Sequence, residues 1–208
     1  MKIVAISDTH TMHRGIDIPD GDVLIHAGDI TGRGSFHQII DFCTWLEQLP
    51  HKHKIVIAGN HDWCFVNKGR EMSAGAISES ATYLEDSEIV IDGIKFYGSP
   101  WQPEFCDWAF NLPRGKALAE KWRMIPDDTD VLITHGPPQH ILDYCPDGNV
   151  GCADLRVRVL RMPNLKYHIF GHIHESYGTE VRGQTTFVNA SVCTGAYKPI
   201  NPPIVIDI

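Results

Sequence analysis

Histidine, aspartate and asparagine side chains recur in five short segments of the sequence, and each segment directly follows a run of Val, Ile, Leu or Ala. The segments are Asp8-Thr9-His10, Gly28-Asp29, Gly59-Asn60-His61-Asp62, Thr134-His135 and Gly171-His172-Ile173-His174. A short apolar run of this kind indicates a buried strand that ends in a loop, and α/β sheets place their chemistry at the carboxyl ends of strands. Carboxylate, amide and imidazole groups gathered at such ends are typical of a metal site.

The candidate metal ligands are more numerous than one ion needs, which favours two ions that share a bridging carboxylate. If Asp29 bridges the ions, one takes Asp8, His10 and His174, and the other takes Asn60, His135 and His172. Imidazole combined with hard oxygen ligands suits manganese, iron and zinc, whereas a thiolate zinc site would need cysteines. We expect Mn²⁺, with Fe, Zn, Ni or Co as alternatives.

Two ions roughly 3.5 to 4 Å apart can clamp the attacking and leaving oxygens of a phosphoryl displacement, and they acidify the bridging water that attacks. No Ser or Cys nucleophile is then required. His61 follows the ligand Asn60 and is free to act as general acid, and we expect Asp62 to orient it. The remaining histidines are expected to be packed or surface side chains: His13, His26, His37, His51, His53, His140 and His168.

Length, composition and charge limit the class of protein. The chain has 208 residues, of which 43% are hydrophobic, and a net charge of −8, which suits one compact domain over residues 1–208. The acidic balance argues against tight binding of long nucleic acid, which depends on Lys and Arg. A bound metal can nevertheless reverse the local sign for a small anionic substrate. The oligomeric state stays open, and a dimer is compatible with the sequence.

No segment that targets or spans a membrane is expected. The first eight residues lead straight into a strand and a polar loop, without the apolar region of a signal peptide. No apolar stretch approaches the roughly 18 residues of a transmembrane helix. The six cysteines form no C-x-x-C pair, which favours reduced thiols. We therefore expect a cytoplasmic protein that does not associate with membranes.

The apolar patterns predict strands that carry the polar segments and helices between them. The expected strands span residues 2–7, 22–27, 54–58, 130–133, 165–170, 185–189 and 204–208, and the expected helices follow Ser35 up to Pro50 and span 116–124 and 153–161. Asp92-Gly93 between two apolar runs predicts a type I′ hairpin and hence a mixed sheet system. Residues 67–81 have weak periodicity and fit either a loosely packed helix or a loop near the site entrance.

A segment rich in aromatic residues and proline follows this hairpin, from residue 98 to residue 110. It contains Trp101, Phe105, Trp108 and Phe110. One interpretation is a packed surface loop. The other is a wall that stacks on a base or ring of a substrate, and Trp101 is then a candidate substrate-binding residue.

Together the five polar segments resemble the signature of the calcineurin-like metallophosphoesterases, which runs D-x-H, G-D, G-N-H-D/E, a later His and G-H-x-H, with every element present here. The resemblance implies an α/β (α+β) fold, an αββα sandwich of two mixed sheets flanked by helices, and the same metal ligands. A closer similarity, to the metallophosphoesterase-domain-containing (MPPED) branch, covers nearly the whole chain. It includes Thr134-His135-Gly136-Pro137-Pro138 and Asn201-Pro202-Pro203-Ile204.

Three positions refine what the resemblance implies. Animal members of the branch can carry Gly where this chain has His172, so we expect full dinuclear occupancy here. Purple acid phosphatases have Tyr at the position of Gly32, so a tyrosinate-bound ferric site is not expected. Arg33 lies where phosphoprotein phosphatases keep an Arg that contacts phosphate, and it is a second candidate for substrate binding.

The metal pattern and the resemblance predict a metal-dependent phosphodiesterase that acts on small phosphodiesters, with 2′,3′ or 3′,5′ cyclic nucleotides as the expected substrates. A phosphomonoesterase or protein phosphatase is the alternative enzyme. A third hypothesis is an interaction scaffold that has kept the fold without the chemistry. Its usual mark is loss of a ligand or of the general acid, and this chain retains both.

Overall fold

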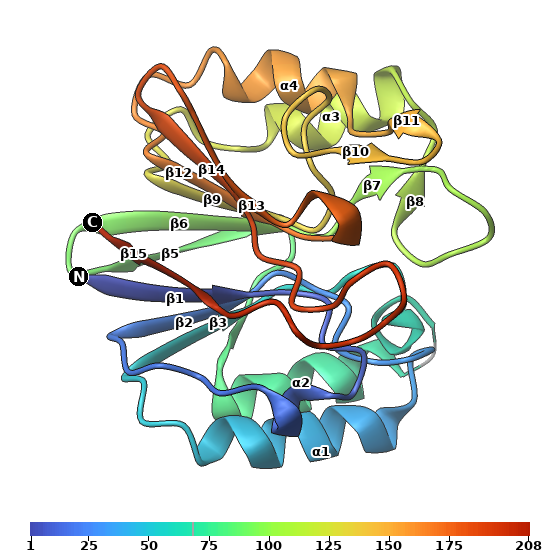
Figure 1. Ribbon diagram of the computed structural model, residues 1–208, viewed down its shortest axis with the longest axis vertical. Helices are drawn as coiled ribbons and strands as arrows, with labels where there is room; N and C mark the ends of the chain where they lie inside the picture. The colour runs from blue at the N-terminus through green and yellow to red at the C-terminus, as the bar shows by residue number, and fades with distance from the viewer. Residues whose placement is uncertain (68) are drawn as a thin grey trace.

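Two β-sheets pack face to face between two layers of helices (Figure 1). The computed structural model describes every residue of the chain except residue 68. The first sheet has the strand order β15-β1-β2-β3-β4, with β1 Lys2–Ile6, β2 Val23–His26, β3 His53–Val56, β4 Thr82–Tyr83 and β15 Ile204–Asp207. The second has the order β13-β14-β12-β9-β6-β5, with β5 Ser87–Ile91, β6 Ile94–Ser99, β9 Val131–Thr134, β12 Tyr167–Phe170, β13 Gly178–Arg182 and β14 Thr185–Asn189.

Helices cover the outer face of each sheet. α1 (Phe36–Glu47) and α2 (Arg70–Ser80) lie on the first sheet, and α3 (Lys116–Arg123) and α4 (Ala153–Val159) lie on the second. Short elements fill the connections, namely the 3₁₀ helices η1 His13–Gly15, η2 Trp63–Phe65 and η3 His174–Ser176, and the strand pairs β7 Gln102–Pro103 with β8 Asn111–Leu112 and β10 Tyr144–Cys145 with β11 Gly148–Asn149. The expected αββα sandwich is confirmed.

The central strands are apolar on both faces because each sheet lies between two packed layers. In β1, Ile3 and Ala5 pack in the layer between the sheets, whereas Val4 and Ile6 pack in the layer under α1. All four side chains are fully buried. Burial of this kind contributes roughly 25 cal/mol per Å² of apolar surface, and it fixes the point at which Asp8 leaves the strand.

Parallel pairing brings the carboxyl ends of the central strands to one end of the sandwich. β1, β2 and β3 are parallel neighbours, and so are β9, β12 and β14. The antiparallel strands β15, β13 and β5 lie at sheet edges, so both sheets are mixed, as expected. The two chain termini lie side by side, at the end from which β1 starts (Figure 1).

The hairpin at Asp92-Gly93 is confirmed, because both residues have the positive φ that a type I′ turn requires, 48° and 81°. Residues 67–81 are largely helical, since α2 lies within them and packs on α1, while residue 68 lies outside the described residues. Strand β13 was not expected. It is a mostly exposed edge strand with the sequence Gly-Thr-Glu-Val-Arg, in which one apolar residue gives almost no alternating pattern.

Three smaller features concern the start of α1, the cysteines and membrane-spanning segments. Ser35 occupies the N-cap position of α1, but its side chain makes no capping hydrogen bond. All six cysteines are free, as expected. Within the described part of the chain, no helix is long and apolar enough to cross a membrane.

Candidate metal centre

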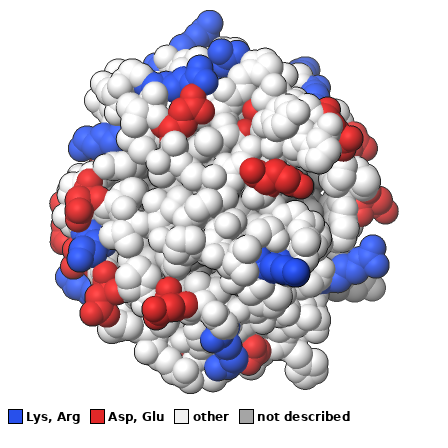
Figure 2. Space-filling model, viewed as in Figure 1, with Lys and Arg blue, Asp and Glu red and all other residues white. Residues whose placement is uncertain are grey.

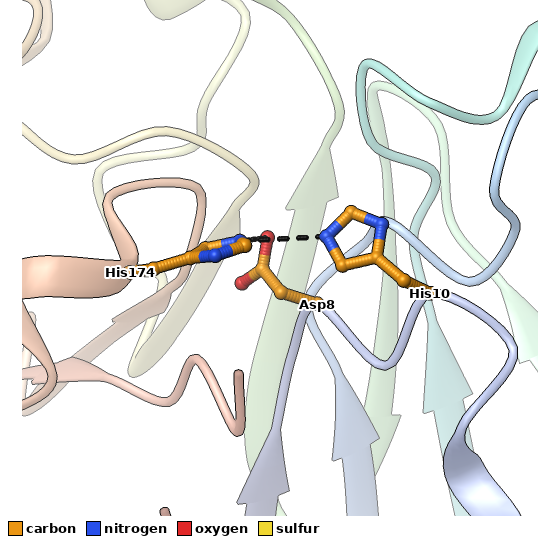
Figure 3. A group of neighbouring side chains, drawn as sticks. All are labelled: Asp8, His10 and His174. Carbon is orange, nitrogen blue, oxygen red and sulfur yellow. Dashed lines mark hydrogen bonds and ion pairs between the residues drawn. The ribbon is translucent and has the colours of Figure 1, made fainter. Parts of the chain in front are cut away.

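The loops after β1 and β12 bring Asp8, His10 and His174 together in one group (Figure 3). His174 Nε2 lies 3.4 Å from Asp8 Oδ1 and 3.4 Å from His10 Nε2. His174 Nδ1 donates to the carbonyl oxygen of Thr194 over 3.0 Å, so Nε2 is the nitrogen that faces the other two side chains. The three residues predicted for the first ion therefore converge.

A second group forms where the loops after β2, β3, β9 and β12 meet. His135 Nε2 lies 2.9 Å from Asn60 Oδ1 and 3.4 Å from Asp29 Oδ1. The centroids of the His135 and His172 rings are 5.0 Å apart, and Asp29, His135 and His172 each offer a ligand atom to one common point. The residues predicted for the second ion are therefore also together.

Asp29 lies between the two groups. Its Oδ2 is 3.8 Å from His10 Nε2, and its Oδ1 is 3.4 Å from His135 Nε2. Oδ1 also accepts the backbone N–H of His61 over 2.8 Å, which fixes the plane of the carboxylate. One oxygen therefore faces each group, an arrangement that suits a carboxylate shared by two ions.

The ligand atoms fit a bound cation. His135 Nδ1 donates to the Ala27 carbonyl oxygen over 2.9 Å, so a neutral ring has no proton left for the two oxygens that crowd Nε2. Without metal, burial lowers the pKa of His135, but the carboxylates of Asp29 and Asp8 outweigh burial and raise it to about 9. Asp8 likewise raises the pKa of His174 to about 8 against burial. A divalent ion can replace these protons, so the residues fit a metal at each group.

Four of the seven ligand residues have left-handed backbone conformations. They are Asp8, His10, Asp29 and His172, with φ of 57°, 42°, 56° and 68°. This region is uncommon for residues other than glycine, although Asp, Asn and His enter it more readily, and such backbone strain gathers at functional sites. Close packing also requires glycine, because a Cβ atom at Gly59 would collide with Asp29 and one at Gly171 with Asp8.

His61 lies at the edge of the centre with one ring nitrogen free. Its Nδ1 donates to the Gly32 carbonyl oxygen over 2.8 Å. Its ring stacks on Trp108, with 4.2 Å between centroids and 21° between planes, and lies edge-on to His10 at 4.6 Å. Nε2 is therefore available to give a proton to a group held at the metal ligands.

Asp62 does not contact the His61 ring, so the expectation that it orients the ring directly is wrong. Its buried carboxylate instead accepts four hydrogen bonds of 2.8 to 3.2 Å, from the backbone N–H groups of Ile30, Thr31 and Gly59 and from the Thr31 hydroxyl. Burial is the main cause that raises the pKa of Asp62 to about 6. Asp62 ties the loop after β2 to the loop after β3, and this places the Gly32 carbonyl that holds His61.

The two candidate substrate-binding residues lie away from the ligands. Trp101 Nε1 donates to Asp86 over 2.8 Å, and its ring packs against two apolar clusters. Arg33 is exposed, with its guanidinium carbon 5.2 Å from the centroid of the Trp108 ring. Among the described residues, the lining of the cleft at the centre includes neither. It includes Phe105 and Trp108, so two other aromatic residues of segment 98–110 line the cleft.

This cleft has a volume of about 640 Å³ and opens from the metal ligands. Its walls are the turn between β7 and β8, the β10–β11 hairpin, η3 and residues 195–197. The walls come from connections between strands and helices, which sequence patterns do not arrange in space. The cleft connects the candidate ligands to the solvent.

His26 was expected to be a packed histidine, and its contacts give it a supporting position. It is fully buried at the end of β2, and burial lowers its pKa to about 3. Its Nδ1 accepts the backbone N–H of Gly28 over 3.3 Å, and its Nε2 lies 3.0 Å from the Thr9 hydroxyl. One neutral ring therefore braces both loops that carry Asp8 and Asp29, and only its place before Gly28-Asp29 marks it in the sequence.

Tyr197 contacts the ligands from the C-terminal segment, and no sequence motif indicates it. Its ring lies edge-on to His10 and His174, at 4.8 Å and 5.2 Å between centroids. Its backbone is left-handed, with φ of 55°, and about half of the side chain is exposed to the cleft. Tyr197 covers the first ligand group on the solvent side.

Comparison with known proteins agrees with this geometry. A family model described as calcineurin-like phosphoesterase matches residues 1–176. Human metallophosphoesterase domain-containing protein 1 is 46% identical over 100% of this chain and 71% of its own length. A Caenorhabditis elegans UPF0046 protein is 42% identical over 100% of this chain and 75% of its own.

Solved structures share the fold at low sequence identity. The protein TT1561 of Thermus thermophilus has a TM-score of 0.60 at 14% identity and covers 90% of this chain and 88% of its own. An archaeal phosphodiesterase has a TM-score of 0.56 at 20% identity, over 100% of this chain and 93% of its own. The resemblance seen in the five polar segments is confirmed. The chain belongs to the calcineurin-like metallophosphoesterase family, which hydrolyses phosphoesters with divalent metal ions, and to its branch of metallophosphoesterase domain-containing proteins.

Proposed function

We propose that the protein is a phosphodiesterase that uses two divalent ions to hydrolyse small phosphodiesters, with 2′,3′ or 3′,5′ cyclic nucleotides as the expected substrates. The observation that carries the proposal is the position of Asp29, whose two carboxylate oxygens face two separate ligand groups. A centre with a single ion would leave one of these groups without a cation. We assign Asp8, His10 and His174 to one ion, and Asn60, His135 and His172 to the other, with Asp29 shared.

The metal ions, when bound, acidify a water that attacks phosphorus and neutralise charge on the phosphoryl oxygens. The protein supplies position and a proton. His61 is held by the Gly32 carbonyl and by Trp108 with its Nε2 free, and it donates a proton to the leaving alcohol oxygen. Asp62 contributes indirectly, by fixing the two loops behind His61.

The cleft supports a small substrate. Its 640 Å³ falls within the roughly 300 to 1,000 Å³ of pockets for small molecules, which a nucleotide fills and a folded protein does not enter. The net charge of −8 also disfavours long nucleic acid. We expect Mn²⁺ as the most effective ion.

Hydrolysis of bis-p-nitrophenyl phosphate and of p-nitrophenyl phosphate, measured with added Mn²⁺, tests the proposal. We expect clear preference for the diester. A strong preference for the monoester would contradict the phosphodiesterase proposal and would indicate a phosphomonoesterase. Asp29→Asn is the matched inactive variant, and if it lost metal yet kept every biological effect, a scaffold role would replace catalysis.

A further inference from the structure

We propose that the cleft selects phosphodiesters whose alcohol portions are uncharged or cationic, and that it rejects substrates with a second anionic group. The inference rests on the proposed phosphodiesterase activity and names the substrate class of the same site. In chemical terms, a cyclic nucleotide or a diester of a neutral or amino alcohol fits, whereas a diester that also bears a phosphomonoester or carboxylate does not.

Three uncompensated carboxylates surround the cleft beyond the metal ligands. Glu104 lies at the turn between β7 and β8, Asp147 in the β10–β11 hairpin and Glu175 in η3. All three side chains are exposed, and within the described part of the chain none of them makes an ion pair or a side-chain hydrogen bond. Acidic side chains gather at the right-hand edge of the face in Figure 2, over the region of β7, β8, β10 and β11 in Figure 1.

Positive charge in the lining is scarce. Arg114 is the one Lys or Arg among the described lining residues. Its Nη1 donates to the Gly151 carbonyl oxygen over 2.8 Å and its Nη2 to the Val150 carbonyl oxygen over 2.6 Å. The guanidinium is thus committed to holding the segment after β11, and a second phosphate would have to compete with those carbonyl groups for it.

The rest of the exposed lining suits an apolar or ring-shaped group. Phe105 and Tyr197 each leave about half of their surface exposed, and Trp108 lies beside His61. Aromatic faces stack on rings and attract cations. The substituents of a phosphoryl group held at the ligands therefore meet aromatic surface and carboxylates.

The cleft is small enough for its lining carboxylates to repel a second anionic group of a bound substrate. A cavity of 640 Å³ is on the order of 10 Å across, which is close to the Debye length of about 8 Å in physiological salt. A second anionic group inside it lies within about one Debye length of several carboxylates. Repulsion of this size weakens with added salt.

Three p-nitrophenyl phosphodiesters of equal length, in which the second alcohol ends in a methyl, a carboxylate or an ammonium group, test the inference. All release the same leaving group, so kcat/KM with Mn²⁺ reports the effect of the end group. At low salt we expect the carboxylate-ended ester to react on the order of tenfold more slowly than the methyl-ended ester. The ammonium-ended ester should react at least as fast as the methyl-ended ester. The difference in kcat/KM between the carboxylate-ended and methyl-ended esters should become smaller in 0.5 M salt, where the Debye length is roughly 4 Å.

The variant Glu104→Gln/Asp147→Asn/Glu175→Gln should raise kcat/KM for the carboxylate-ended ester towards that for the methyl-ended ester. The matched control is Glu79→Gln on α2, away from the cleft lining. This variant should leave kcat/KM unchanged for both the carboxylate-ended and the methyl-ended ester. Equal rates for all three esters in the unchanged protein would overturn this inference alone. Failure to hydrolyse the methyl-ended ester would overturn the phosphodiesterase proposal itself.

Discussion

Three different arrangements of histidine surround the centre, and their partners distinguish them. His135 and His174 each donate Nδ1–H to a backbone carbonyl and turn Nε2 to the centre, as ligands do. His61 has the same arrangement through Gly32, but it lies at the edge, against Trp108. His26 is turned to two loops and not to the centre.

Replacing His61 with Ala separates the proposed general acid from the proposed ligands. A His61 ring nitrogen lies within 4.8 Å of ligand atoms of His10 and Asp29. We assign His61 to proton transfer and not to the metal, so metal content should be unchanged, while turnover should fall roughly 10²- to 10⁴-fold. Steady-state kinetics with metal analysis of the same sample checks this, with exposed His37→Ala as control. Loss of metal in His61→Ala would make His61 a ligand.

At the scale of elements, the centre depends on loops that are fastened to each other. The loops after β2 and β3 are joined through Asp62. The loop after β12 is joined to the loop after β1, because the His172 backbone N–H donates to the Asp8 carboxylate. These contacts hold strained backbone in place, since both Asp8 and His172 have positive φ.

Asp62→Asn should weaken both the fold and the activity. The amide keeps the size of the side chain but loses the negative charge. It also loses one of the two acceptor oxygens, which together accept from four donors. We expect a loss of about 3 kcal/mol in the free energy of unfolding, seen in urea titration, together with reduced turnover. Reduced turnover at full stability would instead mean that Asp62 acts on His61 directly.

The sequence predicts the layers and the convergence of the candidate ligands, because both depend on local pattern. Asp8 and His135 are polar residues at the ends of apolar strands, and such positions are visible in the chain. The role of Asp62 is not, because its partners are backbone N–H groups that carry no residue signature. The sequence does not predict the positions of Tyr197 and β13 for a related reason. Both positions depend on contacts with distant parts of the fold and not on the local residue pattern.

For the whole molecule, buried neutral histidines link stability to pH. His168 is fully buried in β12. Its Nε2 lies 2.8 Å from the Thr134 hydroxyl, which itself donates to the Gly136 carbonyl oxygen, so Nε2 carries the proton. Nδ1 has no partner among the described residues, and burial lowers the pKa of His168 to about 3.

In the unfolded chain, His168 binds a proton with a pKa of 6.5, whereas in the folded chain its pKa is about 3. Stability falls as pH drops through this window, by about 2 kcal/mol between pH 7 and pH 5 for this residue. His168→Gln should flatten the dependence of the unfolding free energy on pH by that amount, whereas exposed His37→Gln should not. Parallel slopes for His168→Gln and the unchanged protein would show that His168 is protonated in the fold.

The central claim is that one chain holds two ions around Asp29, and His172 offers a direct test. Its φ of 68° suits glycine, so His172→Gly removes the imidazole without disturbing the loop. Exposed His140, with φ of 61°, provides the same substitution away from the cleft lining.

Metal analysis after Mn²⁺ loading and desalting gives the decisive number. We predict about two ions per chain in the unchanged protein and in His140→Gly, and about one in His172→Gly. A single ion in the unchanged protein, or two retained in His172→Gly, would contradict the account.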